Sequence, residues 1–225
     1  MKQLEHILTE ISSHIWGPVT LALLLGIGVY LTIGLRFFTL RKVFSAMCIL
    51  WQGRRSDNAG DITPFQALMT ALSATIGTGN IAGVATAIAL GGPGAIFWMW
   101  LTALFGMATK YAEAVLAVKY REVDDQGLHV GGPMYYIQNG LSKKWRWLAY
   151  AFAFFGAFAA FGIGNMVQAN SVAEPLLDTF GIPKLVTGIV IAVLCFAVIV
   201  GGVKRIGAFA AKIVPFMAAF YVLGA

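Results

Sequence analysis

One uncharged stretch decides how this chain is built: Ser73-Ala74-Thr75-Ile76-Gly77-Thr78-Gly79-Asn80-Ile81-Ala82-Gly83. It lies within residues 65–90, a run without Asp, Glu, Lys or Arg that is long enough, at ~1.5 Å per residue, to cross a membrane as a helix. Glycine destabilises a helix interior by ~1 kcal/mol relative to alanine, and polar groups in hydrocarbon need partners. The cluster therefore predicts a discontinuous helix, whose broken backbone is buried in protein or lines a wet cavity.

A break at this point creates a binding site for two ions of opposite charge. If the second half starts at about Thr78 to Asn80, its free N–H groups and positive dipole end favour an anion. The first half ends in unpaired carbonyls, near Ala74 and Gly77, which suit Na⁺. Because residues 65–90 contain no acidic side chain, the anion arrives with the substrate, which favours an amino acid. The candidate substrate-binding residues of this stretch are Thr75, Gly77, Thr78, Gly79 and Asn80.

The same glycines have a second interpretation, which stays open. Gly79-x-x-x-Gly83 is also the pattern of a close helix-packing face in membranes. Nucleotide binding is disfavoured, because the glycines at 77, 79 and 83 have the wrong spacing and no Gly-Lys-Ser/Thr sequence occurs.

The composition indicates a membrane protein. Of 225 residues, 59% are hydrophobic and 12% are charged, against ~25% charged in typical soluble domains. The mean hydropathy is +0.78. The net charge of +6 is better explained by basic cytoplasmic loops than by nucleic-acid binding. Cys48 and Cys195 have no metal-ligand spacing and are expected to be free thiols, and no catalytic constellation suggests an enzyme.

Six membrane spans are predicted, and the basic residues test them. Thirteen Lys and Arg residues fall in the joints after spans one, three and five, or, like Lys212, close to them, as expected of cytoplasmic loops. Lys2 and Lys184 are on the opposite side, so we expect an extracytoplasmic N-terminus. The sixth span requires Lys212 to reach the membrane interface. The spans are 15–35, 65–90, 94–118, 148–167, 185–203 and 206–225.

Four further polar residues lie within the spans or directly beside them. Asn165 and Gln168 are three residues apart near the outer half of span four, where a polar residue can cap a helix end. Lys110 and Glu113 are three apart on span three and can form a structural ion pair that lowers the cost of burying each charge. The alternative is a proton site at Glu113, which the neighbouring lysine opposes by favouring the ionised carboxylate.

Two features lie outside the spans. The joint from Lys119 to Trp147 contains Gly131-Gly132-Pro133 and an aromatic patch, which lies along the membrane interface or belongs to a folded loop. His6, His14 and His129 have no ligand partners at metal spacing and are expected to be solvated.

Several stretches of the chain form a set of motifs that occur in a fixed order. They are Thr63-Pro64-Phe65-Gln66-Ala67-Leu68, the 74–83 segment, Met107-Ala108-Thr109-Lys110-Tyr111-Ala112-Glu113, Gly131-Gly132-Pro133-Met134-Tyr135-Tyr136 and Gly164-Asn165-Met166-Val167-Gln168-Ala169-Asn170. In this order they resemble the alanine/glycine:cation symporter family, whose members are sodium-coupled carriers. The resemblance implies a LeuT-type fold of two inverted five-helix repeats, in which the broken helix begins a repeat. It also implies that Gln168 lies in the substrate pocket and hydrogen-bonds the substrate, and that Asn165 supports the broken helix.

The resemblance sets the expected organisation and function. Residues 1–60 form an extra N-terminal helix and a basic joint, and residues 61–225 form the first repeat of an all-α membrane protein. Since the family implies about twice this length, we interpret the chain as an N-terminal half. The expected function is sodium-coupled symport of alanine or glycine across the inner membrane of a prokaryote, with no cofactor besides Na⁺. A truncated, non-transporting fragment and a proton-coupled carrier are the alternatives.

Overall fold

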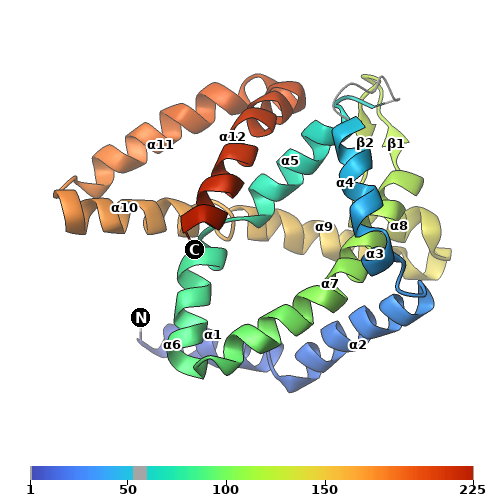
Figure 1. The fold of residues 1–225 in the computed structure, drawn as a ribbon, viewed down its shortest axis with the longest axis horizontal. Coiled ribbons are helices and arrows are strands. Elements are labelled where there is room, and N and C mark those ends of the chain that lie inside the picture. Colours follow the sequence, from blue (N-terminus) through green and yellow to red (C-terminus); the bar gives the residue numbers. More distant parts are fainter. Residues whose placement is uncertain (1, 53–59, 225) are drawn as a thin grey trace.

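The computed structural model describes residues 2–52 and 60–224, which are predominantly helical (Figure 1). Arg54 and Arg55, two of the predicted cytoplasmic basic residues, lie outside the described residues. The elements are α1 (Lys2–Ile15), α2 (Pro18–Gly34), α3 (Phe38–Arg41), α4 (Val43–Gln52), α5 (Pro64–Thr75), the π-helical turn η2 (Gly79–Gly83), α6 (Val84–Gly91), α7 (Gly94–Lys119), β1 (Glu122–Val123), β2 (His129–Val130), α8 (Pro133–Gly140), the 3₁₀ turn η3 (Lys143–Trp145), α9 (Arg146–Ala160), α10 (Met166–Phe180), α11 (Lys184–Ile199) and α12 (Gly202–Gly224).

Within the described residues, three helical segments are long and apolar enough to cross a membrane: His6–Gly34, Gly94–Lys119 and Gly202–Gly224. A fourth crossing is formed if Pro64–Thr75 and Gly79–Gly91 count as one span, because these two segments meet at a 55° bend. The predicted discontinuous helix is confirmed by that bend. The apolar helix α11 is shorter, with 16 residues.

The prediction for span four, residues 148–167, is wrong in its boundary. Helix α9 ends at Ala160, and a turn that contains Gly162 and Gly164 separates it from α10. The Asn165 side chain accepts a hydrogen bond from the Met166 backbone nitrogen at 2.7 Å and caps α10. Asn165 and Gln168 therefore belong to the start of a new helix rather than to the outer end of a span.

The joint between the last two spans is also displaced from its predicted place. Helix α11 ends at Ile199 and α12 begins at Gly202, so Lys204 and Arg205 are helical instead of lying in a loop. Gly202 has a φ of +67°, a left-handed conformation that glycine adopts without the steric cost borne by other residues. This glycine allows the chain to reverse within very few residues.

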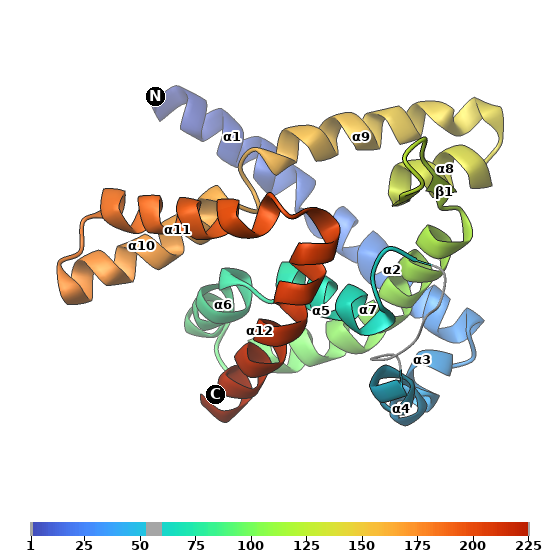
Figure 2. The same cartoon turned by 90° about the horizontal axis from the view of Figure 1, so that it is seen from above.

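Helix α12 packs against α5, and α2 packs against α7, as both ribbon views show (Figures 1 and 2). Met69 of α5 is buried with Ala210 and Val214 of α12 in a small apolar core. Elsewhere large apolar side chains are exposed, among them Leu90 at 86%, Phe158 at 74% and Leu223 at 88%. A surface of this kind is compatible with lipid and with further protein, but not with water.

The joint after α7 contains two short strands that the sequence analysis did not predict. Strands β1 and β2 pair antiparallel, with Glu122 opposite Val130 and Val123 opposite His129. Asp124 closes the hairpin, because its carboxylate accepts the backbone N–H groups of Gln126 and Leu128 at 2.9 and 2.8 Å. The aromatic patch of this joint, Met134 to Ile137, lies in α8 rather than in the hairpin, so its expected position along the membrane interface stays a prediction.

Candidate functional site

The break follows a helix that is fixed firmly at its start. Thr63 and Gln66 form a reciprocal capping box, in which each side chain accepts the backbone N–H of the other residue, at 3.2 and 3.0 Å. Pro64 occupies the first turn, where its missing N–H costs nothing. At the other end, Ile76 has an extended backbone (φ −84°, ψ 110°), so the helical hydrogen bonding stops there. Both ends of helix α5 are therefore well defined, and Gly77 and Thr78 follow directly after its C-cap residue.

Side-chain oxygens accept hydrogen bonds from the backbone N–H groups at the bend. The Gly77 nitrogen donates to Asn80 Oδ1 at 3.2 Å, and the Thr78 nitrogen donates to Gln168 Oε1 at 3.1 Å. The Asn80 nitrogen donates to the Gly77 carbonyl at 3.0 Å. The two side-chain acceptors are neutral amides, so the positive end of the second half meets no charged partner among these contacts.

Gln168 reaches the bend because residue 77 has no side chain. The Gln168 amide lies against Gly77 so closely that a Cβ at this position would overlap its nitrogen. Asn165, by contrast, caps its own helix, and Thr75 donates to the Ala71 carbonyl at 2.8 Å within α5. The contact with the break that the resemblance implies for Asn165 is therefore made by Gln168.

A cavity of about 720 Å³ opens beside the bend. Its polar lining includes Gly77, Thr78, Asn80 and Gln168, and its apolar wall comes largely from α6 and α12. Gly79, which begins η2, is not among the lining residues. The volume is in the range of small-molecule sites. An apolar cleft with a few convergent N–H donors is suited to a small ligand that carries an anionic group.

Tyr221 is a lining residue that the sequence analysis missed. Its hydroxyl donates to the Asn80 carbonyl at 2.8 Å from the far end of α12. Within its own helix Tyr221 resembles any aromatic residue of an apolar span, since its partner is 141 residues away. Sequence spacing contains no signal of such a contact.

Comparison with known families decides the kind of protein. The model of the sodium:alanine symporter family matches residues 1–225. The chain belongs to the sodium:alanine symporter family. Its relatives include a sodium/alanine symporter (AgcS) of Methanococcus maripaludis, 58% identical over 220 residues, which are 96% of this chain and 49% of that protein.

Other relatives carry different names. A probable sodium/glutamine symporter (GlnT) of Bacillus subtilis is 39% identical over 219 residues, which are 97% of this chain and 45% of that protein. A putative sodium/proton-dependent alanine carrier (YrbD) of the same organism is 44% identical over 214 residues, or 95% and 43% of the two chains. The chain spans about half the length of the curated relatives it matches. The family is one of transporters rather than enzymes, and family and apolar helices together indicate an integral membrane protein.

The structure brings Lys110 and Glu113 together on α7. Their nearest side-chain atoms are 2.7 Å apart, and the side chains are 77% and 46% exposed, respectively. Both residues come from one helix, and the pair lies within a candidate span. An ion pair of this kind reduces the cost of placing each charge in lipid.

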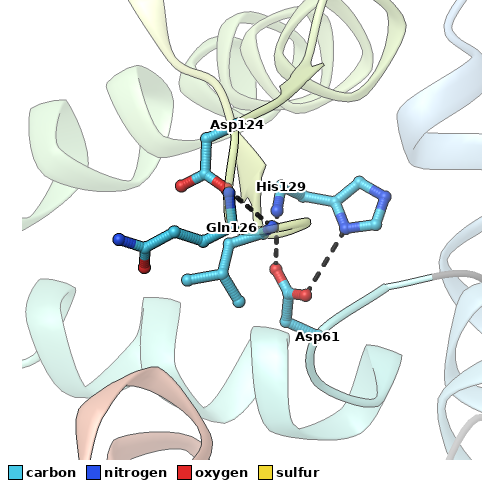
Figure 3. A network of polar contacts seen from close by, with 5 residues as sticks. Asp61, Asp124, Gln126 and His129 are labelled. Atoms are coloured by element: carbon cyan, nitrogen blue, oxygen red, sulfur yellow. Dashed lines mark hydrogen bonds and ion pairs between the residues drawn. The ribbon is translucent and has the colours of Figure 1, made fainter.

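His129 differs from the solvated residue that was expected. Its backbone nitrogen donates to Asp61 Oδ2 at 2.9 Å, and its Nδ1 lies 3.5 Å from Asp61 Oδ1 (Figure 3). The His129 backbone N–H holds the pKa of the Asp61 carboxyl below its ordinary value of 3.8, although burial opposes this shift. Asp61 lies two residues before the capping box, so this contact fastens the β1–β2 hairpin to the start of the broken helix.

Within the described part of the chain, no group of three His, Cys, Asp or Glu side chains could hold a metal ion. Cys48 and Cys195 are free thiols, as predicted. A hard cation at the bend would rely on backbone carbonyls, and the Gly77 carbonyl, although it accepts from Asn80, retains a second lone pair.

Proposed function

We propose that the chain serves sodium-coupled symport of alanine or glycine across the cytoplasmic membrane of a prokaryote. The observation that carries this proposal is the bond between the Thr78 N–H and the Gln168 side chain in a cavity at the break. The Thr78 N–H bonds a neutral amide oxygen, and a carboxylate in the same place would make a stronger hydrogen bond because it is an ionised acceptor. The name of the archaeal relative supports sodium and alanine as ligands.

In this proposal the backbone at the break binds the substrate carboxylate. The N–H groups of Gly77 and Thr78 turn from the side-chain oxygens to the carboxylate, and the dipole of the second half adds a favourable field. Gln168, once released, donates to the same carboxylate through its amide. The apolar wall of the cavity favours a substrate with a small side chain, because the methyl group of alanine or the hydrogen of glycine needs no polar partner.

Sodium binds at the end of the first half, near the carbonyls of Ala74 and Gly77. Its charge would order the unwound segment and attract the substrate carboxylate, so that each ligand raises the affinity for the other. Such reciprocal coupling is what a symporter needs in order to let the ion gradient drive the substrate. The coupling ion is an inference from the chemistry of the carbonyls and from the names of relatives.

We further propose that residues 61–225 form the first repeat of a LeuT-type fold with six spans in total, counting α2. The shorter apolar helices α9 and α11 then complete the crossings, and transport proceeds by alternating access at the break. The distribution of Lys and Arg supports an N-terminus outside the cytoplasm.

The relative named as a sodium/proton-dependent carrier makes proton coupling the second candidate. The discriminating experiment measures alanine uptake into proteoliposomes that contain the intact protein, with a sodium gradient or a pH gradient imposed separately. Uptake that requires sodium and persists without a pH gradient supports the proposal. Uptake driven by a pH gradient in sodium-free buffer would refute it.

A further inference from the structure

Helix α12 crosses the bend and contacts both halves of the broken helix. Its first part packs on α5, where Val214 shares a buried core with Met69. At Gly207 the backbones come so close that a Cβ would lie 3.3 Å from Ile62 Cγ2 and 3.4 Å from Gln66 Cβ. Its last turn reaches the second half, where Tyr221 donates to the Asn80 carbonyl at 2.8 Å. One helix, α12, therefore contacts both of the segments that meet at 55°.

Asn80 is the residue through which this contact reaches the site. Its backbone nitrogen bonds the Gly77 carbonyl, its side chain accepts the Gly77 N–H, and its carbonyl accepts the Tyr221 hydroxyl. Asn80 is thus bonded to both the N–H and the carbonyl of Gly77, the residue directly before Thr78. A change at Tyr221 is transmitted to Gly77 through one intervening residue.

The hydroxyl, rather than the aromatic ring, makes this connection. The neighbouring Phe220 stacks on Phe216 with ring centroids 6.5 Å apart and remains 73% exposed, so aromatic packing at this end of α12 needs no polar group. Tyr221 is 38% exposed and lines the cavity together with Gln168.

We propose that Tyr221 is a positioning residue: its hydroxyl holds Asn80, and through Asn80 it aims the N–H groups of Gly77 and Thr78 at the substrate carboxylate. This inference rests on the proposed function, in which those N–H groups bind the substrate. Tyr221 acts on the site from α12, while Gln168 acts from α10. Together they orient the break from two sides.

The test is Tyr221→Phe, with Tyr30→Phe as the matched control. Tyr30 lies on α2, is 75% exposed and is remote from the cavity lining. In the intact protein reconstituted into liposomes, Tyr221→Phe should raise the KM for alanine about three- to tenfold, the effect of one lost hydrogen bond, with little change in maximal rate. The control should retain the wild-type KM. A variant that merely folded poorly would lose maximal rate and keep its KM, and that result would overturn the proposal.

Hydrogen exchange provides a second measurement that does not depend on transport. Amides of residues 77–84 should exchange faster in Tyr221→Phe than in Tyr30→Phe, because the second half has lost its link to α12. Unchanged exchange would overturn the positioning role, and a raised KM with unchanged exchange would instead place the hydroxyl against the substrate. If the wild-type protein takes up no alanine, the proposed function fails, and the exchange measurement alone decides the role of Tyr221.

Discussion

The Oε1 atom of Gln168 accepts the backbone N–H of Thr78 at 3.1 Å, which joins the first turn of α10 to the middle of a broken helix 90 residues earlier. The bond has two consequences for the break. It satisfies an N–H group that would otherwise be unpaired in a membrane span, and it leaves that group attached to a neutral, exchangeable partner. A substrate carboxylate can take this partner's place without separating a charged pair.

Substitutions at Gln168 should separate the loss of a hydrogen bond from the arrival of a charge. We expect Gln168→Leu to raise the KM for alanine several-fold, because the amide no longer contacts the break. Gln168→Glu should raise the KM further, because a carboxylate at this position repels the substrate carboxylate and binds the backbone N–H groups more strongly. Uptake kinetics in proteoliposomes check both, with Gln138→Leu, at an exposed position of α8, as the control. Equal KM values for wild type and Gln168→Glu would contradict this role.

A methyl group at residue 77 should displace the Gln168 amide. The new Cβ in Gly77→Ala overlaps that amide, which is the far end of a flexible side chain, so the amide moves away and its hydrogen bond with the Thr78 N–H, worth about 0.5–1.5 kcal/mol, is lost. Gly83→Ala is the matched control, because a Cβ at Gly83 meets no atom within 4 Å. Alanine binding measured by scintillation proximity should weaken only in Gly77→Ala. Similar affinities in both variants would mean that the close approach of Gln168 is unimportant.

The sequence predicted the features that depend on local chemistry. Glycines and an asparagine within an apolar run were enough to locate the bend, and a spacing of three residues was enough to pair Lys110 with Glu113. Each of these depends only on the geometry of one helix.

Contacts between distant segments could not be predicted in this way. The partners of Gln168 and Tyr221 depend on how α10 and α12 cross the break, which no local pattern specifies. His129 appeared solvated because its partner, Asp61, precedes it by 68 residues. The boundary of span four was missed because the run 148–167 is uncharged throughout, whereas glycines at 162 and 164 lie in the turn that divides it.

The hairpin contact should depend on pH through Asp61. Because its pKa is lowered in the folded state, the ionised carboxylate contributes stability that is fully present at neutral pH. This contribution declines as the pH falls below the ordinary value of 3.8 and is lost below the lowered folded-state pKa. Asp61→Asn should therefore lower the melting temperature at pH 7. The melting temperature of this variant should also differ less between pH 7 and pH 3 than that of the wild type. The exposed Asp125→Asn serves as control, and identical pH profiles for the two variants would count against the contact.

The Lys110–Glu113 pair should behave as a structural unit. Removing one partner leaves an uncompensated charge in a candidate span, whereas removing both leaves none. We expect Glu113→Gln to destabilise the detergent-solubilised protein more than the double variant Lys110→Met/Glu113→Gln. Thermal unfolding measures this difference. Uptake by the double variant should still depend on sodium. Uptake by this variant that depended on neither sodium nor pH would instead assign Glu113 to ion coupling.

The most direct measurement is uptake of labelled alanine by cells that lack their own carrier and express the intact protein, with and without an inward sodium gradient. We predict uptake that requires the gradient and that is reduced by Gln168→Glu in protein present at wild-type levels in the membrane. Uptake that is indifferent to sodium, or unaffected by a charge at Gln168, would contradict a sodium-coupled site at the broken helix.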